Sequence, residues 1–264
     1  MDVAAVLAAH DALVRRSLVV PAGFVAEDLG RVVRVTAPPG SDSSFVEWSD
    51  LDAATADAEI AAQVAYFSER RQAFEWKTYG RDRPADLGAR LAAAGLVADD
   101  PEAFVVGEPA DVLAATAGHD AVDGVVIRPA DRADLPGMAA LSAAVWGRDA
   151  TAMLTELFDE RDQDPPRLHI LVALAAGEVV SDGWVRLPAD APFASLWGGS
   201  TMPARRGRGI YRALVRQRAL LAAESGHRYL QVDCTPDSRP ILERLGLRQL
   251  DVTTPYRFTP PHVT

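Results

Sequence analysis

The stretch Ala194–Leu221, ASLWGGSTMPARRGRGIYRALVRQRALL, decides the fold of this chain. Its first residues predict a strand, and the pair Gly198-Gly199 is typical of a bulge or a close backbone approach inside a strand. Pro203 ends that strand, and from Ile210 onward the apolar residues recur with a helical period. The stretch therefore predicts a strand, a short basic loop rich in glycine, and a helix.

The loop alternates arginines at 205, 206 and 208 with glycines at 207 and 209. Glycine lets the backbone come close to a ligand, and the first N–H groups of a helix have no partner inside the helix. Those N–H groups and the positive end of the helix dipole favour an anion. The pattern predicts a cradle for a phosphate or diphosphate. The alternative is an exposed basic helix start without a ligand.

Two common phosphate motifs do not fit the loop. A Walker loop needs Lys and then Ser or Thr after its last glycine, where this chain has Ile210-Tyr211. A dinucleotide fingerprint is closer, because Gly207 and Gly209 form G-x-G and an acidic residue ends the next predicted strand. Its third glycine position is Arg212, however, which would obstruct close packing of helix on strand, and no second βαβ unit follows.

The segment Thr201–Leu214 resembles the acyl-CoA-binding motif R/Q-x-x-G-x-G/A of the GNAT (GCN5-related N-acetyltransferase) superfamily, with Tyr211 in place of the final Gly or Ala. The resemblance extends over about residues 125–258, and Arg239–Leu247 is similar to the fourth helix and following turn of that family. It implies a GNAT fold, a mixed α+β architecture in which the fourth and fifth strands splay apart.

The resemblance also implies acetyl-CoA as the cosubstrate and no metal. Thr201 would pair through its backbone with the pantetheine arm, and Gly198-Gly199 suits the bulge that opens the cleft. The diphosphate would be held by the N–H groups of Arg206, Gly207, Arg208, Gly209, Ile210 and Tyr211.

The catalytic groups are less well defined than the loop. Leu242 stands where many members of the family have a tyrosine acid, and the predicted fourth strand carries no carboxylate. Asp233, at the end of the fifth strand, is the candidate base acting through water, or else it only bonds the following turn. Further candidates each have a structural alternative. Cys234 is a nucleophile or a buried small residue, and His169 is a catalyst or a core histidine. One strand face carries the alternating residues Glu75, Lys77 and Tyr79, and it either approaches the site or is a solvated face.

The two halves of the chain share an order of elements. Leu91–Leu96 matches Leu242–Leu247 at an offset of 151 residues, each after a strand and a short helix that begins near a proline. We expect a tandem arrangement of two mixed β-sheets flanked by helices. The predicted parts are a degenerate GNAT-like domain at 1–110 that lacks a diphosphate loop, a linker at 111–124, and an acyl-CoA-binding domain at 125–264.

Composition limits the partners. The 264 residues include 37 acidic and 27 basic ones, and the net charge of −10 disfavours a nucleic acid and mildly favours a cationic small amine. One cysteine excludes an intramolecular disulfide and indicates a reducing, cytoplasmic setting. Neither a membrane span nor a signal peptide is predicted. The oligomeric state stays open.

Two classes of function follow from the sequence. The first is an N-acetyltransferase that moves an acetyl or other acyl group from acetyl-CoA to the amine of a small acceptor, with positioning and desolvation of the amine supplying most of the rate. The second is a non-catalytic acyl-CoA-binding or regulatory protein, because the usual acid and base positions are empty.

Overall fold

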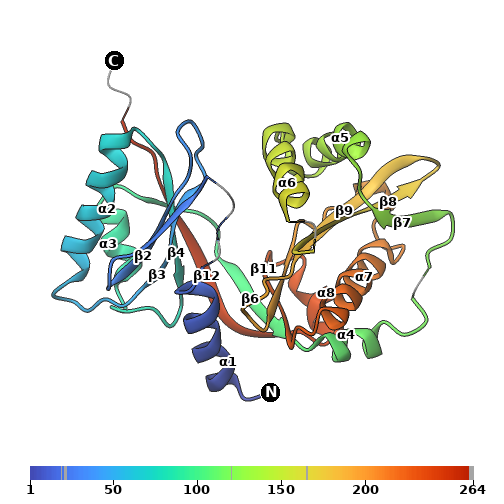
Figure 1. The fold of residues 1–264 in the computed structure, drawn as a ribbon. Helices are drawn as coiled ribbons and strands as arrows, with labels where there is room; N and C mark the ends of the chain where they lie inside the picture. The colour runs from blue at the N-terminus through green and yellow to red at the C-terminus, as the bar shows by residue number, and fades with distance from the viewer. Residues whose placement is uncertain (19, 21–22, 120, 165, 262–264) are drawn as a thin grey trace. The chain divides into compact units, whose positions relative to one another are not determined.

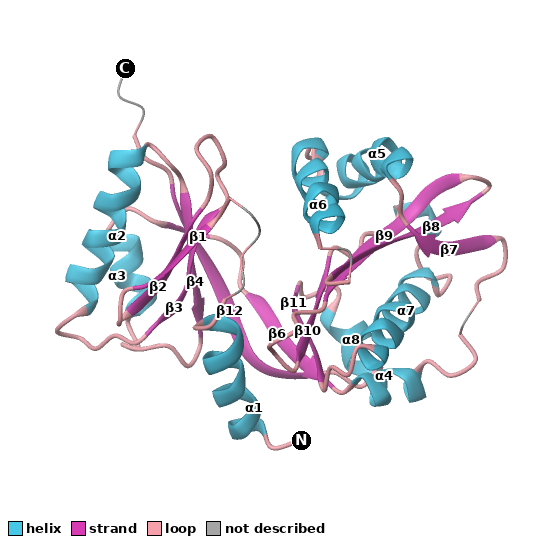
Figure 2. Ribbon diagram, in the orientation of Figure 1, coloured by secondary structure: helices cyan, strands magenta, loops and turns pink. Residues whose placement is uncertain are grey.

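The computed structural model describes residues 1–18, 20, 23–119, 121–164 and 166–261. The chain forms two compact units, each with a run of mixed β-strands flanked by helices, as Figures 1 and 2 show. The predicted α+β class is therefore confirmed. Every helix in the described ranges is too short or too polar to cross a bilayer.

The first unit comprises residues 1–104, 233–239 and 249–264. Its helices are α1 (Val3–His10), the π-helical turn η1 (Asp11–Arg15), α2 (Ala56–Arg70) and α3 (Leu87–Ala93). Its strands are β1 (Val25–Asp28), β2 (Val32–Thr36), β3 (Ser44–Ser49), β4 (Phe74–Tyr79), β5 (Val97–Ala98) and most of β12 (Arg248–Phe258), and β6 (Glu102–Gly107) begins here.

The sheet of the first unit runs β1-β2-β3-β4-β12, and β5 pairs with β12. Strands β3 and β4 are parallel, and helix α2 connects them, whereas β4 and β12 are antiparallel. Helices α2 and α3 pack on one face of this sheet through Phe67 and Leu91, which meet Phe74 and Trp76 of β4 in the core. These side chains follow the alternation and the helical period that the sequence predicts.

The second unit comprises residues 105–232 and 240–248. Its helices are α4 (Pro109–Ala115), the 3₁₀ turn η2 (Arg132–Asp134), α5 (Leu135–Trp146), α6 (Thr151–Gln163), the 3₁₀ turn η3 (Pro203–Arg205), α7 (Ile210–Glu224) and α8 (Arg239–Arg244). Its strands are β7 (Val125–Pro129), β8 (Leu168–Ala175), β9 (Glu178–Arg186), β10 (Phe193–Trp197) and β11 (Tyr229–Cys234).

The sheet of the second unit runs β7-β8-β9-β10-β11, antiparallel except for the parallel pair β10 and β11. Helices α5 and α6 cover one face, where Met138 and Phe158 pack against Ile170 and Trp184. Helix α7 packs Ile210 and Leu214 against Leu171, Ala173 and Val180 in a separate cluster. The phosphate loop predicted from the sequence therefore leads into a helix that is anchored on the sheet.

The predicted internal repeat has the same local structure in both units. In each, two parallel strands flank a helix, and a second short helix follows. That helix ends at a glycine of positive φ, 93° at Gly95 and 94° at Gly246, where the left-handed conformation favours glycine. The next residue then donates its N–H to the carbonyl five residues back, Leu96 to Leu91 at 3.1 Å and Leu247 to Leu242 at 3.2 Å.

The end of the chain packs on the first unit. Strand β12 forms an antiparallel ladder with β4 from Thr253 to Phe258, so residues 249–261 are grouped with the first unit. The predicted linker 111–124 includes most of helix α4, which packs on α7 and accepts a bond from Arg216 at the carbonyl of Leu113. The domain bounds 1–110, 111–124 and 125–264 stay a prediction.

Candidate functional site

The basic loop in the second unit has the geometry of an open anion site. Gly207 and Gly209 have φ of 74° and 85°, and no atom lies within 4 Å of where a Cβ would stand at either residue. Gly209 is the N-cap of α7, and no side chain of the described residues caps this helix. The first N–H groups of a fifteen-residue helix therefore stay available to an anion.

Arginines surround that helix start. Arg206 and Arg208 have exposed side chains, and the Nε of Arg206 donates to the carbonyl of Thr201 at 3.2 Å. Thr201 is buried, and it forms a β-bridge with Ser181 whose hydroxyl lies 2.8 Å from the Thr201 hydroxyl. Thr201 thus braces the loop against β9, while its pairing with a pantetheine arm stays a prediction.

Strands β10 and β11 part just before the loop. Their parallel ladder covers only Phe193–Ser195 and Tyr229–Gln231. Leu196 and Trp197 continue in β10, where within the described ranges they pair with β9 alone. The glycines that follow, with φ of 68° and 87°, carry the chain out of the strand. The second unit therefore contains the splayed parallel pair that the resemblance implies, with the basic loop at its end.

Tyr211 replaces the small residue of the family motif, and Gly199 accommodates it. A Cβ at Gly199 would stand 2.8 Å from Cε2 of the Tyr211 ring, so only glycine leaves room for this ring. Beneath it, Arg218 is buried and donates to the carbonyls of Trp197 at 3.1 Å and Leu214 at 3.2 Å. Burial lowers the pKa of Arg218, and the neighbouring Tyr211 opposes this.

Asp233, the candidate base, lies near the end of β11, where the last residues of this strand, from Asp233 onward, belong to the first unit. Its carboxylate forms an ion pair with Lys77 and accepts a bond from the Thr253 hydroxyl at 3.4 Å. A substrate amine would have to displace the Lys77 ammonium to reach it. Burial lowers the pKa of Lys77, but the charges of Asp233 and Glu47 outweigh burial and raise it. The catalytic role of Asp233 therefore stays a prediction that its contacts do not favour.

The face of β4 that bears Lys77 and Tyr79 is not solvated. The Lys77 side chain is only 11% exposed and Tyr79 is buried, with its hydroxyl donating to Glu47 at 3.2 Å. Burial raises the pKa of Glu47 and that of Tyr79. The alternation of β4 was recognisable from sequence. The ion pair of Lys77 was not, because its partner Asp233 lies 156 residues away along the chain and has no local signal.

The other candidate residues take structural positions. Cys234 is buried at the end of β11, and His169 is half-buried in β8 opposite Val185. Leu242, at the usual tyrosine position, is fully buried in α8. Glu75 has a loose ion pair with Arg257 at 3.4 Å.

Sequence reasoning missed one residue in the second unit. Asp182 lies in β9 within the run VVSDGWV, and only 4% of it is exposed. An acidic residue in the middle of a largely apolar run is the signal that could have identified it, because carboxylates are almost never fully buried without a partner.

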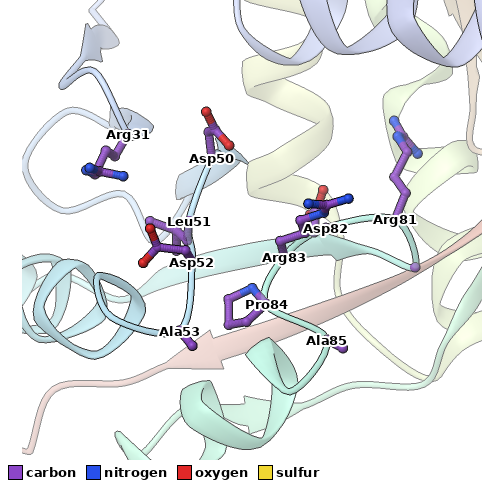
Figure 3. Close-up of a pocket in the computed structure, with 11 residues that line it drawn as sticks. Arg31, Asp50, Leu51, Asp52, Ala53, Arg81, Asp82, Arg83, Pro84 and Ala85 are labelled. Atoms are coloured by element: carbon purple, nitrogen blue, oxygen red, sulfur yellow. The ribbon is translucent and has the colours of Figure 1, made fainter.

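The first unit has an open cavity of about 710 Å³ where the parallel strands β3 and β4 end (Figure 3). Charged side chains line it on both sides: Arg31, Asp50, Asp52, Arg81, Asp82 and Arg83. The chain before α2 is acidic here, and Asp52 already accepts the N–H groups of Ala54 and Thr55, both at 2.9 Å. Bonds from Thr55 hold the pKa of Asp52 below its ordinary value. Carboxylates of Asp50 and Asp52 therefore stand before α2, where the second unit has the arginines of its basic loop before α7.

Comparison with known proteins gives the fold. No family model matches the chain, and no curated protein is significantly similar to it in sequence. A GCN5-related N-acetyltransferase from Kribbella flavida matches with a TM-score of 0.64 at 15% identity, with 91% of each chain covered. A tandem GNAT protein from the clavulanic acid biosynthesis pathway matches with a TM-score of 0.57 at 14% identity, over 92% of this chain and 86% of that one.

A functionally unknown conserved protein from Staphylococcus epidermidis also matches, with a TM-score of 0.68 at 12% identity, over 92% of this chain and 96% of that chain. Identities at this level show a common fold and not a common activity. The chain therefore has the GNAT fold, and the resemblance drawn from the basic loop is confirmed at the level of fold.

Proposed function

We propose that the protein is an N-acyltransferase that moves an acetyl or related acyl group from acyl-CoA to the amine of a small acceptor. Cationic amines belong to this class of acceptors. The observation that carries the proposal is the uncapped, arginine-rich start of α7, placed where β10 and β11 part. Such a site suits a diphosphate, because it combines several N–H groups with more than one guanidinium.

The chemistry divides between ligand and protein. Acyl-CoA, when bound, supplies an acyl group activated as a thioester. The amine nitrogen forms a bond to the acyl carbon, the bond from that carbon to sulfur breaks with the electron pair going to sulfur, and the nitrogen loses a proton. The chain's own part is to hold the diphosphate with Arg206, Arg208 and the N–H groups of residues 207–211, and to orient and deprotonate the amine.

A second candidate function is binding of acyl-CoA without turnover. It is favoured by Leu242, fully buried where the family has its tyrosine acid, and by the engagement of Asp233 with Lys77. Both functions need the same loop, so binding and turnover have to be measured separately.

The test of the loop is calorimetric titration with acetyl-CoA of the parent protein and of Gly209→Asp, which places a carboxylate at the helix start. Gly177→Asp is the matched control, because Gly177 also has positive φ, 83°, with no atom within 4 Å of its Cβ position, but it lies in the β8–β9 turn. We expect binding by the parent and the control and its loss in Gly209→Asp. Absence of binding by the parent would refute the proposal.

Turnover is then measured as release of free thiol from acetyl-CoA in the presence of an amine library. Thiol release that depends on an amine identifies an enzyme. Tight binding with no amine-dependent thiol release across the library would support the second candidate function.

A further inference from the structure

Asp182 is the buried group that the proposed function has not used. Its Oδ1 has no hydrogen-bond partner among the described residues, although only 4% of the residue is exposed. A buried acceptor without a partner costs free energy, so structures that retain one usually place a ligand, an ion or a water there.

The position of Asp182 in the sheet is set by its pairing with the chain before the basic loop. Its N–H donates to the carbonyl of Ser200 at 3.1 Å, and the next residue pair is the bridge between Ser181 and Thr201. Because side chains alternate along a strand, Asp182 lies on the same face of β9 as Trp184, the face that α5 and α6 cover. Asp182 is thus paired with Ser200, the residue directly before the segment Thr201–Leu214 that contains the basic loop.

Three tryptophans gather on this face. Trp184 is the cross-strand partner of Trp197, and its own Nε1 is buried with no hydrogen-bond partner in the part of the chain that the structure describes. Trp197 is 45% exposed, with the Arg186 guanidinium 5.4 Å from its ring centroid, and Trp146 at the end of α5 is 50% exposed. Trp146 donates from Nε1 to the hydroxyl of Ser200 at 2.8 Å, and so reaches the residue that pairs with Asp182. Large aromatic side chains beside a carboxylate are the combination that recognises an organic ammonium ion.

The burial of Asp182 and the charge of Arg218 act in opposite directions on the pKa of the Asp182 carboxyl. Burial raises its pKa from 3.8 to about 7, against the charge of Arg218 and the backbone of Ser200, which lower it. No ion pair joins Asp182 to Arg218 within the described residues. Helix α5 has no ionisable side chain, and on α6 Glu160 is paired with Arg186 at 2.7 Å. On α7, Arg218 interacts with Tyr211.

We propose that Asp182 and the tryptophans of this face, Trp146, Trp184 and Trp197, bind the ammonium group of the acyl acceptor, and that the Asp182 carboxylate takes up its proton. One proton passes from the ammonium nitrogen to Oδ1, which leaves a neutral amine with a free electron pair and a neutral carboxylic acid. The acceptor is then a primary alkylammonium ion with an apolar or aromatic portion that contacts Trp146 and Trp197, the two exposed rings. Only the naming of this amine as the acyl acceptor rests on the proposed function.

The test uses 2-phenylethylammonium as the probe and 3-phenylpropionate as a probe of similar shape and opposite charge, titrated calorimetrically into the full chain without acyl-CoA. The ammonium probe should bind and the carboxylate probe should not. Because the carboxylate must be ionised to attract the probe, affinity should rise about tenfold between roughly pH 6 and pH 8. A residue that only supports the fold would give no such dependence.

Two variants and one control locate the site. Asp182→Asn keeps the shape and removes the charge, and it should weaken binding about tenfold or more and abolish its pH dependence. Trp197→Ala, at an exposed position, should weaken binding about threefold. Asp190→Asn, in an exposed loop of the same unit, should change nothing.

Failure of the parent protein to bind the ammonium probe, equal binding of both probes, or unchanged binding by Asp182→Asn would each overturn the proposal. Misfolding of Asp182→Asn would leave the pH dependence of the parent and the Trp197→Ala result to decide it. The titration contains no acyl-CoA, so its outcome is separate from that of the acetyl-CoA titration. Amine binding without acetyl-CoA binding would retain this site and refute the acyltransferase.

Discussion

Replacing Arg15 with methionine tests how the first unit is held together. Arg15 ends the turn η1, and its side chain is only 2% exposed. It donates two bonds to the Asp82 carboxylate and one to Asp11, all at 2.8 Å, and one to the carbonyl of Glu47 at 3.0 Å. Methionine retains much of the volume and removes all four bonds. Among the described residues, the side chain of Asp82, itself 5% exposed, then keeps only its bond from the Tyr79 N–H.

The expected loss follows from this geometry. Removing one partner of a buried ion pair costs about 3–5 kcal/mol, because the remaining charge stays buried without compensation. For a chain of this size, that corresponds to a fall in melting temperature of about 10 °C. Arg16→Met is the matched control, since the neighbouring Arg16 pairs with Asp28 at 3.3 Å with both side chains 47% exposed. An exposed pair contributes about 1 kcal/mol or less.

Urea denaturation followed by circular dichroism measures the loss for the whole chain. Hydrogen–deuterium exchange of the peptides that cover β3 and β4 keeps the measurement local to the first unit. Equal effects of Arg15→Met and Arg16→Met, or faster exchange confined to the second unit, would show that the buried pair does not have the assigned role.

Three further predictions concern packing and pH. Leu91→Ala and Leu242→Ala remove fully buried side chains at equivalent positions of the repeat, and each should cost about 2–5 kcal/mol in urea denaturation, whereas a cost below about 1 kcal/mol would contradict the packing. Gly199→Ala should lower the melting temperature, because its φ of 87° and the Tyr211 ring both oppose a Cβ; an unchanged melting temperature would contradict the close contact. Burial lowers the pKa of His10 from 6.5 to about 3, so between these pH values the unfolded chain binds a proton that the folded chain does not. The free energy of unfolding should therefore fall as the pH decreases from 6.5 toward 3, and His10→Gln should flatten that slope.

Local sequence determined the elements that depend on near neighbours. The stretch around the arginines and glycines before Ile210 predicted a strand, a basic loop and a helix, and the structure has these elements in that order, whereas the phosphate cradle stays a prediction. The glycine stops after the two short helices were equally local, since each bonding pattern closes within six residues. Such features form from short-range sterics and capping, so the order of residues alone carries them.

Tertiary structure decided the contacts that join distant segments. The pairing of β12 with β4 and the ion pair of Lys77 with Asp233 bring together residues far apart in the chain. In the sequence, Asp182 is only an acidic residue within a largely apolar run. Whether its Oδ1 has a hydrogen-bond partner depends on the groups that the loop before α7 and the helices α5 and α6 place around it. Burial and partnership are properties of the packed chain, because they depend on which surfaces meet and not on which residues adjoin.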